Sequence, residues 1–235
     1  MRYSRALVVP VLLTALMVVS AQEKSVRPGI NDSFKNPDLK KYLGTFEGES
    51  REIFTRREQI LAACKIEPGL VVADVGAGTG LFTRLFASKV GPTGKVYAVD
   101  IAQRFLDYID KTAKEAGLSN IKTIRCSQTS TELPANSVDL VFVCDTYHHF
   151  EFPQRTLASI HKALKPSGRL IVIDFHRIPG KSREWTLNHV RAGQEVFTRE
   201  IVEAGFQLEG EEKELGLKEN YFLRFKRVDS AKKTP

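Results

Sequence analysis

The sequence predicts an α/β protein with a Rossmann-like, doubly wound, seven-stranded sheet in a single domain. Three observations predict this fold: an apolar run that breaks into glycines before a helical pattern, β-rich runs that alternate with helical patterns, and a final pair of short strands. At 235 residues, 42% hydrophobic and 27% charged, the chain fits one globular domain with short appendages.

The first expected elements are a helix over 49–64 and a strand over 70–75. Apolar residues recur at helical spacing in the helix, which Pro68 and Gly69 end, and we expect this helix to cover the ligand pocket. The apolar run LVVADV then suits a buried parallel strand.

Three glycines follow this strand, at positions 76, 78 and 80, in the segment DVGAGTG. They allow a sharp turn and bring bare backbone close to a ligand. A dinucleotide fingerprint would have its last glycine at position 81, where Leu81 stands, so pyrophosphate binding is disfavoured. The helix that begins there has an apolar stripe and directs its N-terminal amides at the same crevice.

The second strand, 95–100, ends in Asp100. Its offset from the glycines is roughly the 20 residues at which an acidic residue meets a ribose in such folds. A carboxylate accepts hydrogen bonds from both ribose hydroxyls, so Asp100 is a candidate ribose ligand.

The rest of the chain continues the alternation. A second amphipathic helix over 105–113 closes at Gly117, and a third strand spans 121–125. The fourth strand, 138–144, is almost continuously apolar and therefore central. The remaining expected elements are a helix from Pro153 that residues 165–168 end, a strand over 169–175, a helix from Thr198 to Gly205, and antiparallel strands at 206–211 and 221–226.

The DVGAGTG segment and Asp100 together resemble the class I S-adenosylmethionine-dependent methyltransferases, and more closely the small-molecule branch that includes quinone and arsenite methyltransferases. The resemblance covers roughly residues 45–228. It implies S-adenosyl-L-methionine as cofactor and a small-molecule substrate. Many members have an acidic residue after the third strand that takes the adenine amine, whereas this chain has none there, so Ser127 or a carbonyl near Gln128 would replace it. The predicted cofactor-binding residues are Asp74, Gly76, Ala77, Gly78, Gly80, Asp100, Ile101, Ser127, Gln128 and Asp145.

The chemistry is expected past the fourth strand, because ligands of open α/β sheets bind at the switch point between the first and fourth strands. The residues there read DTYHHF, and the fifth strand ends in DFHR. We expect His148 or His149 to serve as a base or to orient the acceptor, Tyr147 to form a wall of the methyl site, and Asp145 to hold the amino end of the cofactor or the acceptor. The predicted catalytic residues are Asp145, Tyr147, His148, His149 and His176.

Two alternatives stay open for these side chains. Each histidine is otherwise a packed or solvent-facing ring. Asp145, His148, His149 and His176 offer O and N donors suited to Zn, Fe or Mn, but adjacent histidines usually project apart, and no metal site is predicted. The connection 181–197, with Trp185, Asn188 and Arg191, is the expected substrate rim.

The first 21 residues have the pattern of a secretory signal. Arg2 and Arg5 precede an apolar run over 6–19, and small residues stand before Gln22. The prediction is cleavage before Gln22 and export to the periplasm or medium; the alternative is an uncleaved N-terminal membrane tether. The other predicted regions are a flexible arm over 22–44, the methyltransferase domain over 45–228 and a disordered tail over 229–235.

Charge patterning excludes one class of partner. The formal net charge is +7, but basic residues are scattered with no basic run interleaved with aromatics, which argues against a nucleic-acid groove. The alternative to an enzyme is a non-catalytic exported binding protein that retains a nucleoside-like pocket. The oligomeric state is not predicted.

Overall fold

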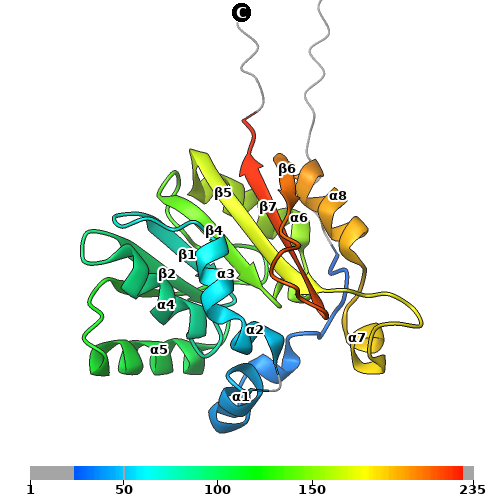
Figure 1. Cartoon of the computed structure of the whole chain (residues 1–235), viewed down its shortest axis with the longest axis horizontal. Helices are drawn as coiled ribbons and strands as arrows, with labels where there is room; N and C mark the ends of the chain where they lie inside the picture. The colour runs from blue at the N-terminus through cyan, green and yellow to red at the C-terminus, as the bar shows by residue number, and fades with distance from the viewer. Residues whose placement is uncertain (1–23, 50, 230–235) are drawn as a thin grey trace, which may run out of the picture.

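The computed structural model describes residues 24–49 and 51–229; the predicted signal segment, residues 1–21, lies outside them. The described chain forms a seven-stranded sheet in the order β3-β2-β1-β4-β5-β7-β6. Five strands are mutually parallel, and β7 runs antiparallel to β5 and β6 (Figure 1). The predicted fold class is therefore confirmed. The strands are β1 (Val71–Val75), β2 (Lys95–Asp100), β3 (Ile121–Arg125), β4 (Val138–Cys144), β5 (Leu164–Phe175), β6 (Phe206–Glu211) and β7 (Asn220–Arg227).

Helices cover both faces of the sheet, and successive residues of the central strands face opposite layers. On β4, Leu140 and Phe142 pack with α3 and α4, whereas Val141 and Val143 pack with α6 and α8. This double burial explains the continuous apolar sequence of β4. The helices are α1 (Leu39–Phe46), α2 (Glu52–Thr55), α3 (Arg57–Ala63), α4 (Leu81–Val90), α5 (Gln103–Glu115), α6 (Pro153–Ala163), α7 (Glu184–His189) and α8 (Gln194–Glu203), with 3-10 turns η1 (Asp32–Phe34) and η2 (Tyr147–His149).

Three element boundaries differ from the sequence prediction. The expected helix over 49–64 is two helices, because the backbone at Arg56 leaves helical geometry between α2 and α3. Helix α8 begins four residues before Thr198, after Gly193 as its N-cap. Strand β5 begins at Leu164, which pairs with Val138 across an irregularity in the ladder.

Residues 24–49 and 51, here called the N-terminal strap, contain η1 and α1 where the sequence predicts a flexible arm. Strap side chains bond to distant segments: Arg27 Nη2 donates to the Asn188 carbonyl at 2.7 Å, and Asn31 Nδ2 donates to the His149 carbonyl at 3.0 Å. Figure 1 shows α1, α2 and α7 together at the end of the sheet where β4 and β5 finish. The strap thus lies over the edge at which a ligand is expected.

The helices of the described chain are short, and α5, with 13 residues, is the longest of them. Among the residues that the structure describes, no helix has both the length and the apolar character needed to cross a bilayer.

Candidate functional site

A cavity of about 740 Å³ opens at the carboxyl ends of the parallel strands. Its floor comes from the loops after β1, β2, β3 and β4, and its cover comes from the strap and from α7. This is the switch point of the sheet, because β1 pairs with both β2 and β4. The predicted site residues that line it are Gly76, Gly78, Asp100, Ile101, Ser127, Gln128, Asp145, His148 and His149.

The glycine loop leaves no room for side chains. Gly76, Gly78 and Gly80 all have positive φ, which glycine adopts without strain. A Cβ on Gly76 would overlap the Thr146 side chain, and one on Gly80 would lie 2.7 Å from Ile109 Cγ1. The loop therefore presents bare backbone to the cavity at Gly76 and Gly78, while Gly80 serves packing against α5.

Asp100 fixes the loop from the neighbouring strand. The Gly78 amide donates to Asp100 Oδ2 and the Ala102 amide to Asp100 Oδ1, both at 2.8 Å. Burial raises the pKa of Asp100 to about 6, against the lowering effect of these amide bonds. Each carboxylate oxygen keeps a second lone pair for a ligand hydroxyl.

Asp74 lies beneath the loop, outside the large cavity. Its Oδ2 accepts a hydrogen bond from Thr83 Oγ1 at 2.7 Å, which ties β1 to the first turn of α4. Burial raises the pKa of Asp74 to about 7, and the Thr83 hydroxyl partly offsets this. Ala77 is likewise buried beneath the loop.

Asp145 lies in the cavity wall with a left-handed backbone, φ 48°. Its carboxylate pairs with Arg51 of the strap and accepts from the Asn220 side-chain amide. Burial raises the pKa of Asp145, and the Arg51 guanidinium opposes that rise. Asp145 thus connects the strap, the end of β4 and the start of β7.

His148 forms a buried dyad with Asp174 at the end of β5. The distance from His148 Nδ1 to Asp174 Oδ1 is 2.8 Å, and the His148 amide donates to Asp174 Oδ2 at 3.0 Å. Because a carboxylate accepts hydrogen bonds, Nδ1 is the donor, and in the neutral ring Nε2 therefore has the lone pair. The ring is 1% exposed and lines the cavity.

His149 and His189 meet beside this dyad. Their Nε2 atoms are 3.3 Å apart, and the His189 ring stacks on Trp185 with centroids 4.6 Å apart. Burial, together with the smaller effect of the neighbouring His148, lowers the pKa of His149 to about 2 and that of His189 to about 4. Both rings are therefore neutral near pH 7.

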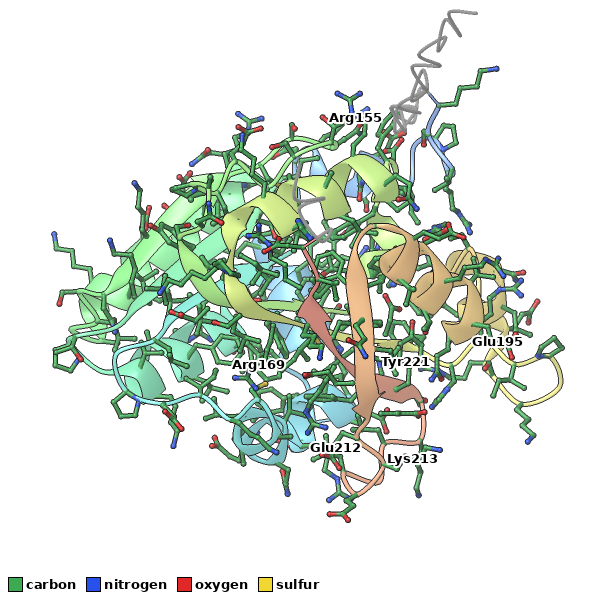
Figure 2. All side chains as sticks on the ribbon, turned by 90° about the horizontal axis from the view of Figure 1, so that it is seen from above. Arg155, Arg169, Glu195, Glu212, Lys213 and Tyr221 are labelled. Atoms are coloured by element: carbon green, nitrogen blue, oxygen red, sulfur yellow. The ribbon has the colours of Figure 1, made fainter. Side chains whose placement is uncertain are left out.

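The other two predicted catalytic residues do not line the cavity. The Tyr147 hydroxyl donates to Glu200 Oε2 at 2.9 Å, and the ring is fully buried against Phe150 and Phe197. The His176 ring packs on Tyr221 of β7, a residue labelled in Figure 2, with centroids 5.6 Å apart. Of the predicted rim over 181–197, Arg183, Trp185 and His189 line the cavity, whereas Asn188 does not and Arg191 pairs with Glu200.

Sequence reasoning missed the residues that the strap supplies. Phe34, Tyr42, Phe46 and Arg51 all line the cavity, and the three rings cluster with Phe105 of α5. The apolar spacing of residues 39, 42, 43 and 46 was the available signal for α1, but the polar surroundings masked it. Asp174 was visible at the end of a predicted strand without an assigned partner.

Part of the chain is similar in sequence to known methyltransferases. Residues 73–172 match the family model described as a methyltransferase domain. A C-methyltransferase of ubiquinone/menaquinone biosynthesis, UbiE, from Bordetella parapertussis is 32% identical over 113 residues, which are 48% of this chain and 43% of the relative. The UbiE of Ectopseudomonas mendocina is 34% identical over 116 residues, or 49% and 45% of the two chains. The match thus spans less than half the length of these relatives.

Solved structures show the same fold. A SAM-dependent methyltransferase from Aquifex aeolicus superposes with TM-score 0.71 at 24% identity, covering 82% of this chain and all of that one. The [4+2]-cyclase SpnF superposes with TM-score 0.63 at 18% identity, covering 74% of this chain and 81% of that one. Because a cyclase shares the fold, the architecture alone does not fix the reaction.

These relatives overturn one prediction. The expected export is wrong, because the relatives are methyltransferases of ubiquinone/menaquinone biosynthesis, a class that is typically cytoplasmic. The alternative of an uncleaved membrane tether stays a prediction. The apolar run that suggested export lies within residues 1–21, outside the described part of the chain.

Proposed function

We propose that this chain, whose residues 73–172 match the methyltransferase domain family, is a class I methyltransferase that transfers a methyl group from S-adenosylmethionine to a small-molecule acceptor. The observation that supports this most strongly is the shared cavity, in which the glycine loop and Asp100 face the loop 145–150. The non-catalytic alternative finds no support among the relatives.

The residues present fit the cofactor. Gly76 and Gly78 leave backbone exposed where any Cβ would be strained, and Asp100 has acceptor capacity at the end of β2. Ile101, Ser127 and Gln128 line the adjoining wall, where we place the adenine. We place the amino end of the cofactor near Asp145. When bound, the cofactor supplies a methyl group already activated on a sulfonium.

His148 is the base we propose. Asp174 holds the His148 ring through Nδ1, so Nε2 is the atom that takes the acceptor proton. His149 is a poorer base, because its pKa near 2 leaves little driving force for taking a proton. Tyr147 and His176 are assigned no contact with the acceptor, since neither lines the cavity.

The acceptor we propose is a phenol or hydroquinone. Phe34, Phe150, Phe175 and Trp185 supply aromatic walls on the side of the cavity near the histidines, and such walls suit a planar ring. The UbiE relatives, which are C-methyltransferases of quinone biosynthesis, favour the same class. Phenols, hydroquinones, amines and thiols should be screened in parallel.

Isothermal titration with S-adenosylhomocysteine tests the cofactor assignment. Asp100→Ala should weaken binding by about 1.5–3 kcal/mol, the range for hydrogen bonds to a charged group. Asp107→Ala is the matched control, because Asp107 is an exposed α5 residue that accepts from the Gln103 side chain outside the cavity. Unchanged affinity in a folded Asp100→Ala protein would place the ribose elsewhere.

Single-turnover kinetics test the base. His148→Gln should slow methyl transfer by about 10²- to 10⁴-fold, the usual cost of losing a general base, with S-adenosylhomocysteine affinity preserved. His161→Gln, outside the cavity, should change neither. If His148→Gln transfers methyl at the normal rate, His148 is scaffolding and the assignment must move to Asp145.

A further inference from the structure

The three histidines of the cavity form a cluster that the methyl-transfer proposal does not use in full. His148, His149 and His189 come from η2 and α7, which are about 40 residues apart in sequence. One ring nitrogen from each lies within 4.8 Å of the other two. We propose that His148, His149 and His189 bind a divalent, zinc-type cation that faces the acceptor side of the cavity.

The closest nitrogen pair already has the spacing of metal ligands. In a tetrahedral zinc site with Zn–N distances of about 2.0–2.1 Å, neighbouring ligand nitrogens are about 3.3–3.4 Å apart. The Nε2 atoms of His149 and His189 are 3.3 Å apart. The third nitrogen needs only a small inward rotation of the rings, because no separation in the cluster exceeds 4.8 Å.

The outer shell also fits a metal site. Histidine ligands usually donate their other ring N–H to a carboxylate or carbonyl, which fixes the ring and raises its basicity. Asp174 makes this contact with His148 Nδ1 at 2.8 Å, and the Phe175 amide holds the same carboxylate oxygen at 2.7 Å. The His148 lone pair is thereby oriented by two buried groups.

Simple packing explains the cluster less well. The three ring centroids are only 4.3–5.2 Å apart, so three polar rings are crowded at the wall of a cavity. A cation that takes up imidazole lone pairs accounts for this crowding.

Three imidazole ligands indicate which metal ion the site would bind and leave one coordination position open. Imidazole nitrogens suit Zn, Cu, Fe and Ni rather than Mg or Ca. Three protein ligands with a fourth position open to substrate is the arrangement of catalytic zinc. If the proposed function holds, the fourth ligand is the acceptor hydroxyl, whose proton leaves to solvent on coordination. The ion then occupies the His148 nitrogen that would otherwise take that proton.

Trp185, the only tryptophan of the chain, makes binding directly observable. Its indole stacks on the His189 ring, so a cation at His189 should change the emission of Trp185. The untagged full chain, stripped with a chelator, should be titrated with ZnCl₂ while tryptophan emission is followed. Competition with a chromophoric chelator gives the dissociation constant, and Co²⁺ should give the visible absorption of a tetrahedral complex.

The expected result is about one ion per chain and a loss of affinity in His189→Ala that exceeds the roughly 10- to 100-fold loss typical of outer-shell changes. His189 is half-buried on a surface helix, so this variant should fold. His149→Ala should behave alike, and Asp174→Asn should show the smaller outer-shell loss. His161→Ala should bind as the unaltered chain does, because His161 bonds to the Val228 carbonyl and does not line the cavity.

Two outcomes would overturn the proposal: no zinc binding tighter than that of His189→Ala, or binding that His148, His149 and His189 variants leave unchanged. Binding of S-adenosylhomocysteine is measured separately on the same metal-free samples. If that ligand binds while zinc does not, the metal site is refuted and the proposed methyl transfer stands. If zinc binds and S-adenosylhomocysteine does not, the proposed function fails alone.

Discussion

At position 76 the backbone needs glycine for two separate reasons, its positive φ of 77° and the closeness of Thr146. Gly117 isolates the first reason, because its φ of 69° is similar but nothing lies within 4 Å of its Cβ position. Replacing each glycine with alanine therefore separates the cost of the backbone conformation from the cost of the steric overlap.

Gly117→Ala should therefore lower the free energy of unfolding only by the cost of a left-handed alanine, about 1–2 kcal/mol. Gly76→Ala should lower it by the same cost and by about 1–3 kcal/mol more, because the new Cβ overpacks against Thr146. This variant should also bind S-adenosylhomocysteine more weakly. Chemical denaturation and calorimetric titration of both variants measure the two effects. Equal losses of stability at the two positions would mean that Thr146 moves aside freely.

Asp74 predicts a pH dependence of stability. Its pKa is raised from 3.8 to about 7 in the folded state, so the native chain binds this proton more tightly than the unfolded chain. Stability should consequently fall as pH rises from about 4 to about 7 and level off above that range. At about 1.4 kcal/mol per unit of pKa, the Asp74 contribution is on the order of 4 kcal/mol.

Asp74→Asn should flatten this part of the profile, because asparagine can still accept from Thr83 without ionising. Urea denaturation at a series of pH values between 4 and 8 makes the comparison. The matched control is Asp110→Asn on the exposed side of α5, which bonds to Thr123. A profile for Asp74→Asn that parallels the unaltered chain would show that Asp74 is not the titrating group.

At the scale of elements, the strap is joined to the sheet through a buried ion pair. The side chains of Arg51 and Asp145 are 24% and 6% exposed, whereas those of Arg183 and Glu219 are 59% and 43% exposed. Removing one partner of a buried pair leaves an uncompensated charge and costs about 3–5 kcal/mol. Exposed pairs contribute about 0–1 kcal/mol.

Arg51→Ala should thus destabilise the chain by several kcal/mol, and Arg183→Ala by about 1 kcal/mol or less. The double variant Arg51→Ala with Asp145→Asn should recover much of the loss, since no buried charge remains. Denaturation midpoints of the unaltered chain, Arg51→Ala, Asp145→Asn and the double variant complete the cycle. If the double variant is less stable than Arg51→Ala, the pair acts through geometry rather than charge.

The elements also show what could be predicted from sequence. The central parallel strands were predictable, because a strand buried on both faces is continuously apolar, as β4 is. The edge strand β3 is partly exposed and has a mixed sequence, so it lacks this signal. Helix α1 was not, because its neighbours are polar and its stability comes from rings on other elements, such as Phe105. The break at Arg56 likewise depends on where α2 docks: Glu52 accepts from three backbone amides before β7.

At the scale of the whole molecule, the site joins segments that are distant in sequence. The glycine loop and Asp100 were predictable, since both follow strands in a recognised order. The dyad of His148 with Asp174 was not predicted as a pair, although both residues were noted, because His148 lies in η2 after β4 and Asp174 near the end of β5, 26 residues later. The His149–His189 contact was not predictable, since it depends on how the connection after β5 folds back over the cavity.

A ligand that bridges these segments should stabilise the whole chain. At a concentration one hundred times its dissociation constant, S-adenosylhomocysteine should add about 2.7 kcal/mol to the free energy of unfolding. For a chain of this size, that corresponds to a rise in melting temperature of roughly 5–11 °C.

NAD⁺ at the same concentration should give no rise, because the glycine spacing disfavours a pyrophosphate. Differential scanning calorimetry of the full chain makes the comparison, with Asp100→Ala as the variant in which the rise should shrink. An equal rise with NAD⁺ would mean that the cavity binds adenosine whether a pyrophosphate or a thioether is attached to its ribose, and the methyl-transfer proposal would lose its support.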